Sequence, residues 1–308
     1  MHGAWKCMKN KQQGFALPIT LIILSLLTVL AMGLSQLARQ DTKKIQNQQY
    51  RLNDELSLKS TNQWVLYQLL SGVPDKNTKQ NGRFILSVDN RPIKHQQTTL
   101  QVQDAAGLMG LYLYDARKFE KLLMQLTDKQ QAIKVAAQLK DWIDKDSRAS
   151  YQGMEIAAYR NTNQAMLPRN GPIRSLDELL ELPAMTRELY NGTDKKIGLR
   201  DLLLAGGVSD FNIATAPDVL LAAMLNISAK QTAQIQNLKS TKNWRQIRQM
   251  TAKMPIFFDS SPLGQAYQYR VILTLPSGVK ARSLLQLTPS KEKPYQFKQW
   301  QYPDNDRG

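Results

Sequence analysis

The sequence has one cysteine and two histidines among 308 residues. A single thiol, Cys7, excludes an intramolecular disulfide and any zinc site built from several thiolates. His2 and His95 are far apart in the sequence, so they give little support to a metal site based on paired histidines. Most common hydrolase mechanisms therefore lack their usual residues.

Acidic residues are also scarce. The chain has 25 Asp and Glu against 41 Lys and Arg, a formal net charge of +16. This balance suits an anionic membrane surface, nucleic acid or an acidic protein partner, and the charge alone does not choose among them. Hydrophobic residues make up 42% of the chain, which is enough for a packed core and for about two domains at this length.

One stretch, residues 15–38, has no charged residue and is long enough to cross a bilayer as a helix. Three lysines precede it, and the first acid of the chain is Asp41. The positive-inside rule therefore predicts a cytoplasmic N-terminus and places the bulk of the chain in the periplasm or outside the cell. Three alternatives compete: a signal anchor, a signal peptide cleaved after residues 31–33, and a short leader cleaved between Gly14 and Phe15.

The junction between Gly14 and Phe15 favours the third alternative. A polar, basic leader ends at Gly14, and the apolar helix begins directly with Phe15. The junction resembles the class III leader of type IV pilins and type II secretion pseudopilins. This resemblance implies that a prepilin peptidase cuts after Gly14 and methylates the new amine of Phe15.

Helical periodicity continues beyond the apolar stretch, to about residue 70. Apolar residues recur there at helical spacing: Ile45, Leu52 and Leu56, then Leu58, Val65 and Leu69. Residues 71–74 (SGVP) contain glycine and proline and are expected to end the helix. Pro18 falls in the first turn, where its missing amide need not break the helix.

The fifth residue after the cleavage junction is Ile19. Pilin-like major subunits carry a glutamate at that position, which can pair with the N-terminal amine of a neighbouring subunit in the apolar filament core. A subunit at the start of the filament meets no such amine, so it does not need the charge.

The rest of the chain predicts an α+β fold. Strands are expected at residues 83–88 and 99–102, in a hairpin of residues 267–275 and 279–287, and at residues 295–302. About 150 residues between these β regions have mostly helical patterns, so we predict a pilin-type domain with an antiparallel sheet, interrupted by a helical insert. The helices expected in the insert cover residues 115–126, 128–144, 175–181, 185–190, 199–204, 217–225 and 229–238.

The predicted organisation has five parts along the chain. They are a leader at 1–14, a membrane-spanning and spine helix at 15–72, the first part of the pilin-like domain at 73–114, the inserted helical domain at 115–255, and C-terminal strands at 256–308.

Four short segments occur in a characteristic order: residues 104–108 (DAAGL), 141–146 (DWIDKD), 171–179 (GPIRSLDEL) and 212–217 (NIATAP). Together with the leader, Ile19 and the insert, they resemble the minor pseudopilin K family of the type II secretion system. The resemblance implies a non-enzymatic subunit at the tip of the pseudopilus, which initiates or caps assembly with the minor pseudopilins I and J. It also implies an inner-membrane anchor, a periplasmic bulk, and contacts with other pseudopilus subunits, the secretion platform, prepilin peptidase and membrane lipid.

A candidate metal site follows from Asp141, Asp144, Asp146 and Glu155, which concentrate oxygen ligands around Gly153. The spacing is not that of an EF-hand, and a solvated, acidic helix end is the alternative. The family resemblance implies calcium in the insert. Where related sequences tend to continue with acids, residues 156–158 are Ile-Ala-Ala, so one site is reduced in charge or lost.

Two further function classes remain to be compared with the sequence. The turns at residues 182–185 and 225–228 resemble helix-hairpin-helix elements, which suggests a DNA-engaging pilin of an uptake machine. Neither turn has the glycines that let a phosphate approach, so we expect packing rather than nucleic-acid contact. For an enzyme, Asp115, Asp201 and Asp210 occur in no catalytic motif, and such residues are usually caps and surface groups.

Overall fold

The computed structural model is divided into two compact units, Met1–Leu56 and Ser57–Gly308, each described here by itself. Gly14 and Phe15, on which the leader prediction rests, lie outside the described residues. The described residues are 16–71, 79–80, 83–84, 86–112, 114–162, 166–193, 195–207, 211–251, 267–288, 290 and 292–303.

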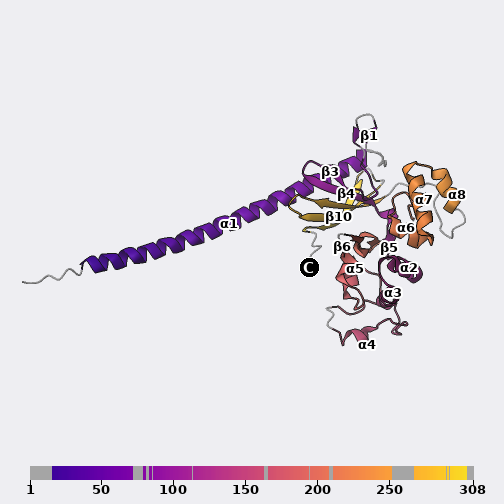
Figure 1. Ribbon diagram of the computed structural model, residues 1–308, viewed down its shortest axis with the longest axis horizontal. Coiled ribbons are helices and arrows are strands. Elements are labelled where there is room, and N and C mark those ends of the chain that lie inside the picture. The colour runs from indigo at the N-terminus through magenta and orange to yellow at the C-terminus, as the bar shows by residue number, and fades with distance from the viewer. Residues whose placement is uncertain are drawn as a thin grey trace, which may run out of the picture. The chain divides into compact units, whose positions relative to one another are not determined.

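A single long helix, α1 (Ala16–Ser71), begins the described chain (Figure 1). It confirms the helix predicted to run to about residue 70, and it passes through Pro18 without interruption. Its first part is long and apolar enough to cross a membrane once. The Thr20 hydroxyl donates to the Leu17 carbonyl at 2.9 Å, which satisfies a polar group inside this apolar stretch.

An antiparallel sheet of five strands, ordered β11-β10-β9-β4-β3, forms the centre of the second unit. Strands β9 (Gln268–Thr274), β10 (Lys280–Leu287) and β11 (Tyr295–Gln301) confirm the predicted hairpin and last strand. β4 (Thr98–Asp104) pairs directly with β9, although most of the chain's helices lie between them in sequence. The insert therefore leaves the sheet at the end of β4 and returns at the start of β9.

The last turns of α1 pack on this sheet. Leu58 and Val65 are fully buried in a cluster with Leu100 of β4 and Val271 of β9. Buried polar groups between helix and sheet are paired, since the Ser283 hydroxyl donates to Asn62 Oδ1 at 3.0 Å. The leucine and valine spacing that predicted the helix thus marks the face that covers the sheet.

The strand predicted at residues 83–88 is wrong in extent. β1 (Lys79–Gln80) pairs with β2 (Arg83–Phe84), and residues 86–88 are buried without belonging to a strand. Residues 86–90 meet β4 at an isolated bridge between Asp89 and Gln103, after which Asn90 adopts a positive φ of 65° and turns away. The edge strand β3 (Ile93–His95) forms instead between the two predicted strands, where no strand was expected.

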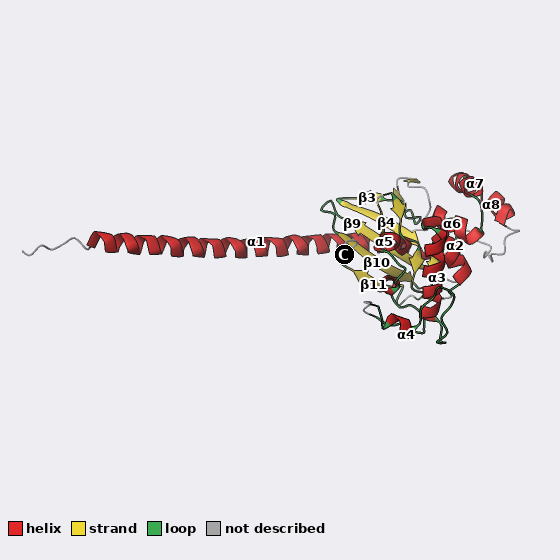
Figure 2. Cartoon of the chain, turned by 60° about the horizontal axis from the view of Figure 1, so that its bottom comes forward, coloured by secondary structure: helices red, strands yellow, loops and turns green. Residues whose placement is uncertain are grey.

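The insert is built around α2 (Ala116–Leu126), α3 (Lys129–Ile143) and α6 (Asp218–Leu225), whose apolar faces share one core. Asp115 and Asp128 cap α2 and α3 by accepting backbone N–H bonds, so both helices begin where the sequence predicts. Figure 2 shows these helices beside the sheet. The remaining elements are η1 (Ala105–Gly107), β5 (Met109–Gly110), α4 (Ile156–Tyr159), η2 (Leu176–Glu181), α5 (Arg187–Asn191), β6 (Gly192–Thr193), β7 (Lys196–Ile197), η3 (Leu199–Asp201), β8 (Leu203–Leu204), α7 (Ala229–Ser240) and α8 (Trp244–Thr251).

Two expected helices of the insert take another form. Residues 175–181 form the 3-10 helix η2 after the Ser175 capping box, and residues 199–204 divide into η3 and the short strand β8. β8 pairs in parallel with β5, a partner distant in sequence that local periodicity does not reveal. The helices α4 and α8 were not predicted.

A buried carboxylate joins β4 to the insert. Asp104 Oδ2 accepts hydrogen bonds from Asn212 Nδ2 at 2.7 Å and from the Thr215 hydroxyl at 3.0 Å, and Oδ1 accepts from the Ala106 amide at 2.8 Å. A Cβ at Gly107 would lie 2.7 Å from the Thr215 hydroxyl oxygen. The segments 104–108 and 212–217, singled out in the sequence, are therefore the two sides of one joint.

Candidate metal centre

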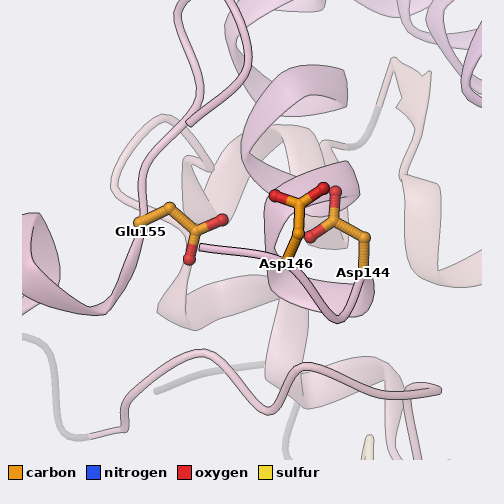
Figure 3. Close-up of side chains that lie close together, drawn as sticks. All are labelled: Asp144, Asp146 and Glu155. Carbon is orange, nitrogen blue, oxygen red and sulfur yellow. The ribbon is translucent and has the colours of Figure 1, made fainter. Parts of the chain in front are cut away.

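Three carboxylates meet in the segment that connects α3 to α4. Asp144, Asp146 and Glu155 each offer an oxygen, and these oxygens lie within 4.8 Å of one another. Figure 3 shows Glu155 reaching toward Asp144 and Asp146 from the far end of the segment. Oxygens bound on opposite sides of a calcium ion at about 2.4 Å would be about 4.8 Å apart, so the cluster has the right size for such an ion.

Asp141, the fourth predicted ligand, has a different position. It is fully buried, and its two carboxylate oxygens accept the Ser150 amide at 3.2 Å and 3.0 Å. The Lys140 ammonium donates to the Ser150 hydroxyl at 2.9 Å from the same helix end. Asp141 thus holds the segment that carries the other three acids.

The cluster is short of hydrogen-bond donors. Glu155 is 8% exposed, and within the described part of the chain neither of its carboxylate oxygens accepts a hydrogen bond. Asp144 Oδ1 is also buried, and it accepts no hydrogen bond from the described residues. Buried acceptors normally find donors, so these oxygens fit a cation better than they fit a closed polar network.

Electrostatics agree with this geometry. Burial raises the pKa of Glu155, and the charges of Asp141 and Asp144 raise it further. Burial likewise raises the pKa of Asp144, with added repulsion from Asp146 and Asp141. Four neighbouring carboxylates repel one another, and a divalent cation would remove that repulsion.

Glu178 stabilises the segments beside the site, although in the sequence it is marked only as part of the segment 171–179. It accepts hydrogen bonds from Trp142 Nε1 at 3.2 Å and from Arg169 Nη2 at 2.9 Å, as well as from the backbone amide of Arg174 at 3.0 Å. The Trp142 ring meets Tyr159 of α4 edge to face, with centroids 5.5 Å apart. The two helices that border the metal segment are therefore fixed to one another. The capping box formed with Ser175 marks Glu178 in the sequence as a helix-capping residue.

In the two hairpin-like turns, backbone amides donate hydrogen bonds to other groups of the protein. At 225–228, the Ile227 amide donates to the Ala222 carbonyl and the Ser228 amide to Gln231 Oε1. At 182–185, the Ala184 amide donates to Gln138 Oε1 at 2.9 Å. Phosphate recognition would need such amides to point outward, so the structure disfavours the DNA-binding alternative.

The other singled-out residues lie elsewhere. Asp115 is a helix cap, and Asp201 pairs with Arg282 at 3.2 Å. Asp210 lies outside the described residues. Ile19 is 52% exposed on α1.

Comparison with known proteins shows which proteins this chain is similar to. A family model described as type II secretion system (T2SS), protein K matches residues 101–197, a range that includes the second half of β4, all of α2 and α3, and all four candidate acids. A curated Klebsiella pneumoniae relative, type II secretion system protein K, is 26% identical over 200 residues. Over these residues the chain is similar to type II secretion system protein K. The alignment covers 59% of this chain and 61% of the Klebsiella protein.

The fold comparison extends further along the chain. A chain in the crystal structure of the GspK-GspI-GspJ complex from the enterotoxigenic Escherichia coli type 2 secretion system superposes with a TM-score of 0.54. The match covers 84% of this chain and 99% of that chain at 16% identity. The chain therefore has the α+β, pilin-like fold that the sequence predicts.

Proposed function

We propose that this chain is a non-enzymatic minor pseudopilin that initiates or caps the pseudopilus of a type II secretion system. The observation that carries the proposal is the direct pairing of β4 with β9 across a large helical insert. A pilin-like sheet on a membrane-competent helix can join a filament, and the insert gives the head a bulk that a repeating subunit would have to accommodate. The family match supports this reading.

The tip position has two supports. A head enlarged by the insert would obstruct subunits stacked above it in a helical array. Ile19 offers no charge to a preceding subunit's amine, so burying that amine beneath this helix would be costly. Both features suit a subunit that has neighbours on one side only.

The partner surface is proposed on α1, beyond its apolar stretch. Ile45, Leu52 and Leu56 are 56%, 56% and 55% exposed, and their spacing of seven and four places them on one helical face. An apolar face on a helix outside the membrane is stabilised by a second amphipathic helix. We propose that the helices of the minor pseudopilins I and J cover it, because the similar structure is that of a GspK-GspI-GspJ complex.

Calcium is the proposed cofactor of the metal centre. Asp144, Asp146 and Glu155 would hold the ion, with Asp141 as the positioning residue. Three carboxylates without nitrogen or sulfur ligands are typical of hard cations. The ion would tie the end of α3 to the start of α4 and so stabilise the insert.

Processing and location complete the proposal. We infer that prepilin peptidase cleaves after Gly14, that α1 anchors the chain in the inner membrane, and that the bulk lies in the periplasm. Mass spectrometry of the purified mature chain should give the mass of a protein that begins at a methylated Phe15. A mature chain that begins near residue 34 would refute the pseudopilin assignment.

Co-purification tests the partners. The full-length chain, expressed with the candidate I and J subunits and solubilised in detergent, should elute as one complex with one copy of each. Leu52→Glu with Leu56→Glu should abolish the complex, because charges on the exposed face oppose helix association. Lys43→Glu with Lys44→Glu changes two other α1 residues and should leave the complex intact. Separate elution of the unmodified chains would contradict the proposal.

A further inference from the structure

The last three helices of the insert form a lobe with a core of its own. α8 lies against α7, at the periphery of the insert in both views (Figures 1 and 2). Ile235 of α7 and Ile247 of α8 are buried there with Leu221 and Leu225 of α6. Trp244 and Met250 of α8 pack against the same core, so the apolar side of α8 is turned inward.

Within this lobe, α7 and α8 carry charge of one sign, whereas α6 begins with the exposed acid Asp218. Residues 219–251 contain no Asp or Glu and five Lys and Arg. Four of these are exposed and define what we name the cationic face: Lys230, Lys242, Arg245 and Arg248. The fifth, Lys239, is turned inward, where its ammonium donates to the Ala216 carbonyl at 3.0 Å.

The helix α2 is different. α2 carries Glu120 among its lysines and arginine, and Lys118 forms an ion pair with Asp115 at 3.7 Å. Surfaces that serve solubility mix both signs in this way. A field of one sign steers an oppositely charged partner instead.

We propose that the cationic face is a docking surface for an acidic segment of a protein partner. Arg245 and Arg248 are one helical turn apart and flank the outward side of α8, a spacing that lets both guanidinium groups pair with carboxylates of one segment. Exposed amides at Gln246 and Gln249 lie on the same helix and add neutral hydrogen-bonding groups.

Two other anionic partners fit less well. A helix that binds lipid turns an apolar face outward, but no large hydrophobic side chain of residues 219–251 is exposed. Nucleic acid would use hairpin amides or stacking aromatics, and here the Ile227 and Ser228 amides are bonded internally while Trp244 is half-buried. An acidic polypeptide needs neither feature.

This inference does not depend on the tip assignment, since it rests on the surface of the insert alone. The test compares two variants of the full-length chain in detergent. One replaces Lys242, Arg245 and Arg248 with Gln, and its matched control replaces Arg117, Lys118 and Lys121 of α2 with Gln. All three positions of the first set are exposed, so the circular dichroism and melting temperature should match the unmodified chain.

The probe is fluorescent poly-L-glutamate, with phosphatidylglycerol vesicles and duplex DNA as parallel ligands. The variant with Lys242, Arg245 and Arg248 replaced should bind poly-L-glutamate at least about tenfold more weakly and with a shallower salt dependence. The affinity of the α2 control for poly-L-glutamate should change less than about threefold. Equal losses in the two variants, or no loss in either, would overturn the proposal, as would a selective loss seen only with vesicles or only with DNA. Because the α8 substitutions leave Leu52 and Leu56 unchanged, co-purification with the I and J subunits reports separately on the proposed function.

Discussion

Gly153 lies so close to Asp141 that a Cβ at position 153 would be 1.9 Å from Asp141 Oδ2. Asp141 is fully buried and holds the Ser150 amide, so its side chain has no room to move aside. The glycine therefore allows the metal segment to fold over the carboxylate. Sequence reasoning assigned Asp141 to the ligand set, but in the structure it positions the segment.

Gly153→Ala should destabilise the protein by about 1–3 kcal/mol, since the added methyl forces Asp141 off the Ser150 amide. Urea unfolding, followed by tryptophan fluorescence, measures the change. Gly206→Ala is the matched control, because no atom lies within 4 Å of its Cβ position. An unchanged midpoint for Gly153→Ala would show that the packing around Asp141 is not tight.

Calcium should raise the melting temperature of the unmodified chain, because an ion that binds only the folded state stabilises it by about 2.7 kcal/mol at one hundred times its Kd. Asp144→Ala with Asp146→Ala should remove this effect. Asp115→Ala removes a helix cap outside the cluster, so it should lower the melting temperature but keep the calcium response. A calcium response that survives in the double variant would exclude these ligands.

The hydrogen bonds of Glu178 predict a pH dependence of stability. Burial tends to raise its pKa, but the hydrogen bonds from Arg169, the Arg174 amide and Trp142 outweigh burial and lower it below the ordinary 4.5. The ionised form is therefore favoured by folding. Its contribution is complete above pH 4.5 and is lost as the pH falls through the folded-state pKa.

Glu178→Gln should accordingly cost about 2–4 kcal/mol near neutral pH and progressively less below pH 4.5. Chemical unfolding between about pH 3 and pH 7 measures the difference. A cost that is the same across the whole range would show that the charge of Glu178 is not involved.

Thr215→Val tests the joint between β4 and the insert. Losing one donor to buried Asp104 should cost about 1–3 kcal/mol. Burial already raises the pKa of Asp104, and the variant raises it further, so the cost should be larger at neutral pH than below the ordinary value of 3.8. Thr241→Val, at an exposed hydroxyl, should change stability by less than about 0.5 kcal/mol. Equal costs for the two variants would contradict the role of the joint.

Local signals predicted much of this fold. Helix N-caps such as Asp115 and Asp128 act within one turn, so the sequence alone predicts where α2 and α3 begin. The β9–β10 hairpin follows from alternation around a short turn. In contrast, the pairing of β5 with β8 joins segments far apart in the chain, and no local pattern encodes it.

The candidate metal site, too, could be predicted from the sequence only in part. Carboxylate spacing was enough to predict that Asp144, Asp146 and Glu155 lie near one another. Whether a particular acid points to the cluster or to a backbone amide depends on the path of residues 147–153, and this separates Asp141 from the others. The role of Glu178 depends on Arg169 and Trp142, which reach it from other segments.

The position and number of this subunit in the pseudopilus test the central claim most directly. Pseudopili from cells that produce the epitope-tagged, full-length chain can be labelled with gold and imaged, and its abundance relative to the major subunit measured by quantitative mass spectrometry. The account predicts label at one end of each filament and about one copy per filament, as expected of a subunit that closes an array. Label repeated along the shaft, at an abundance comparable to that of the major subunit, would contradict it.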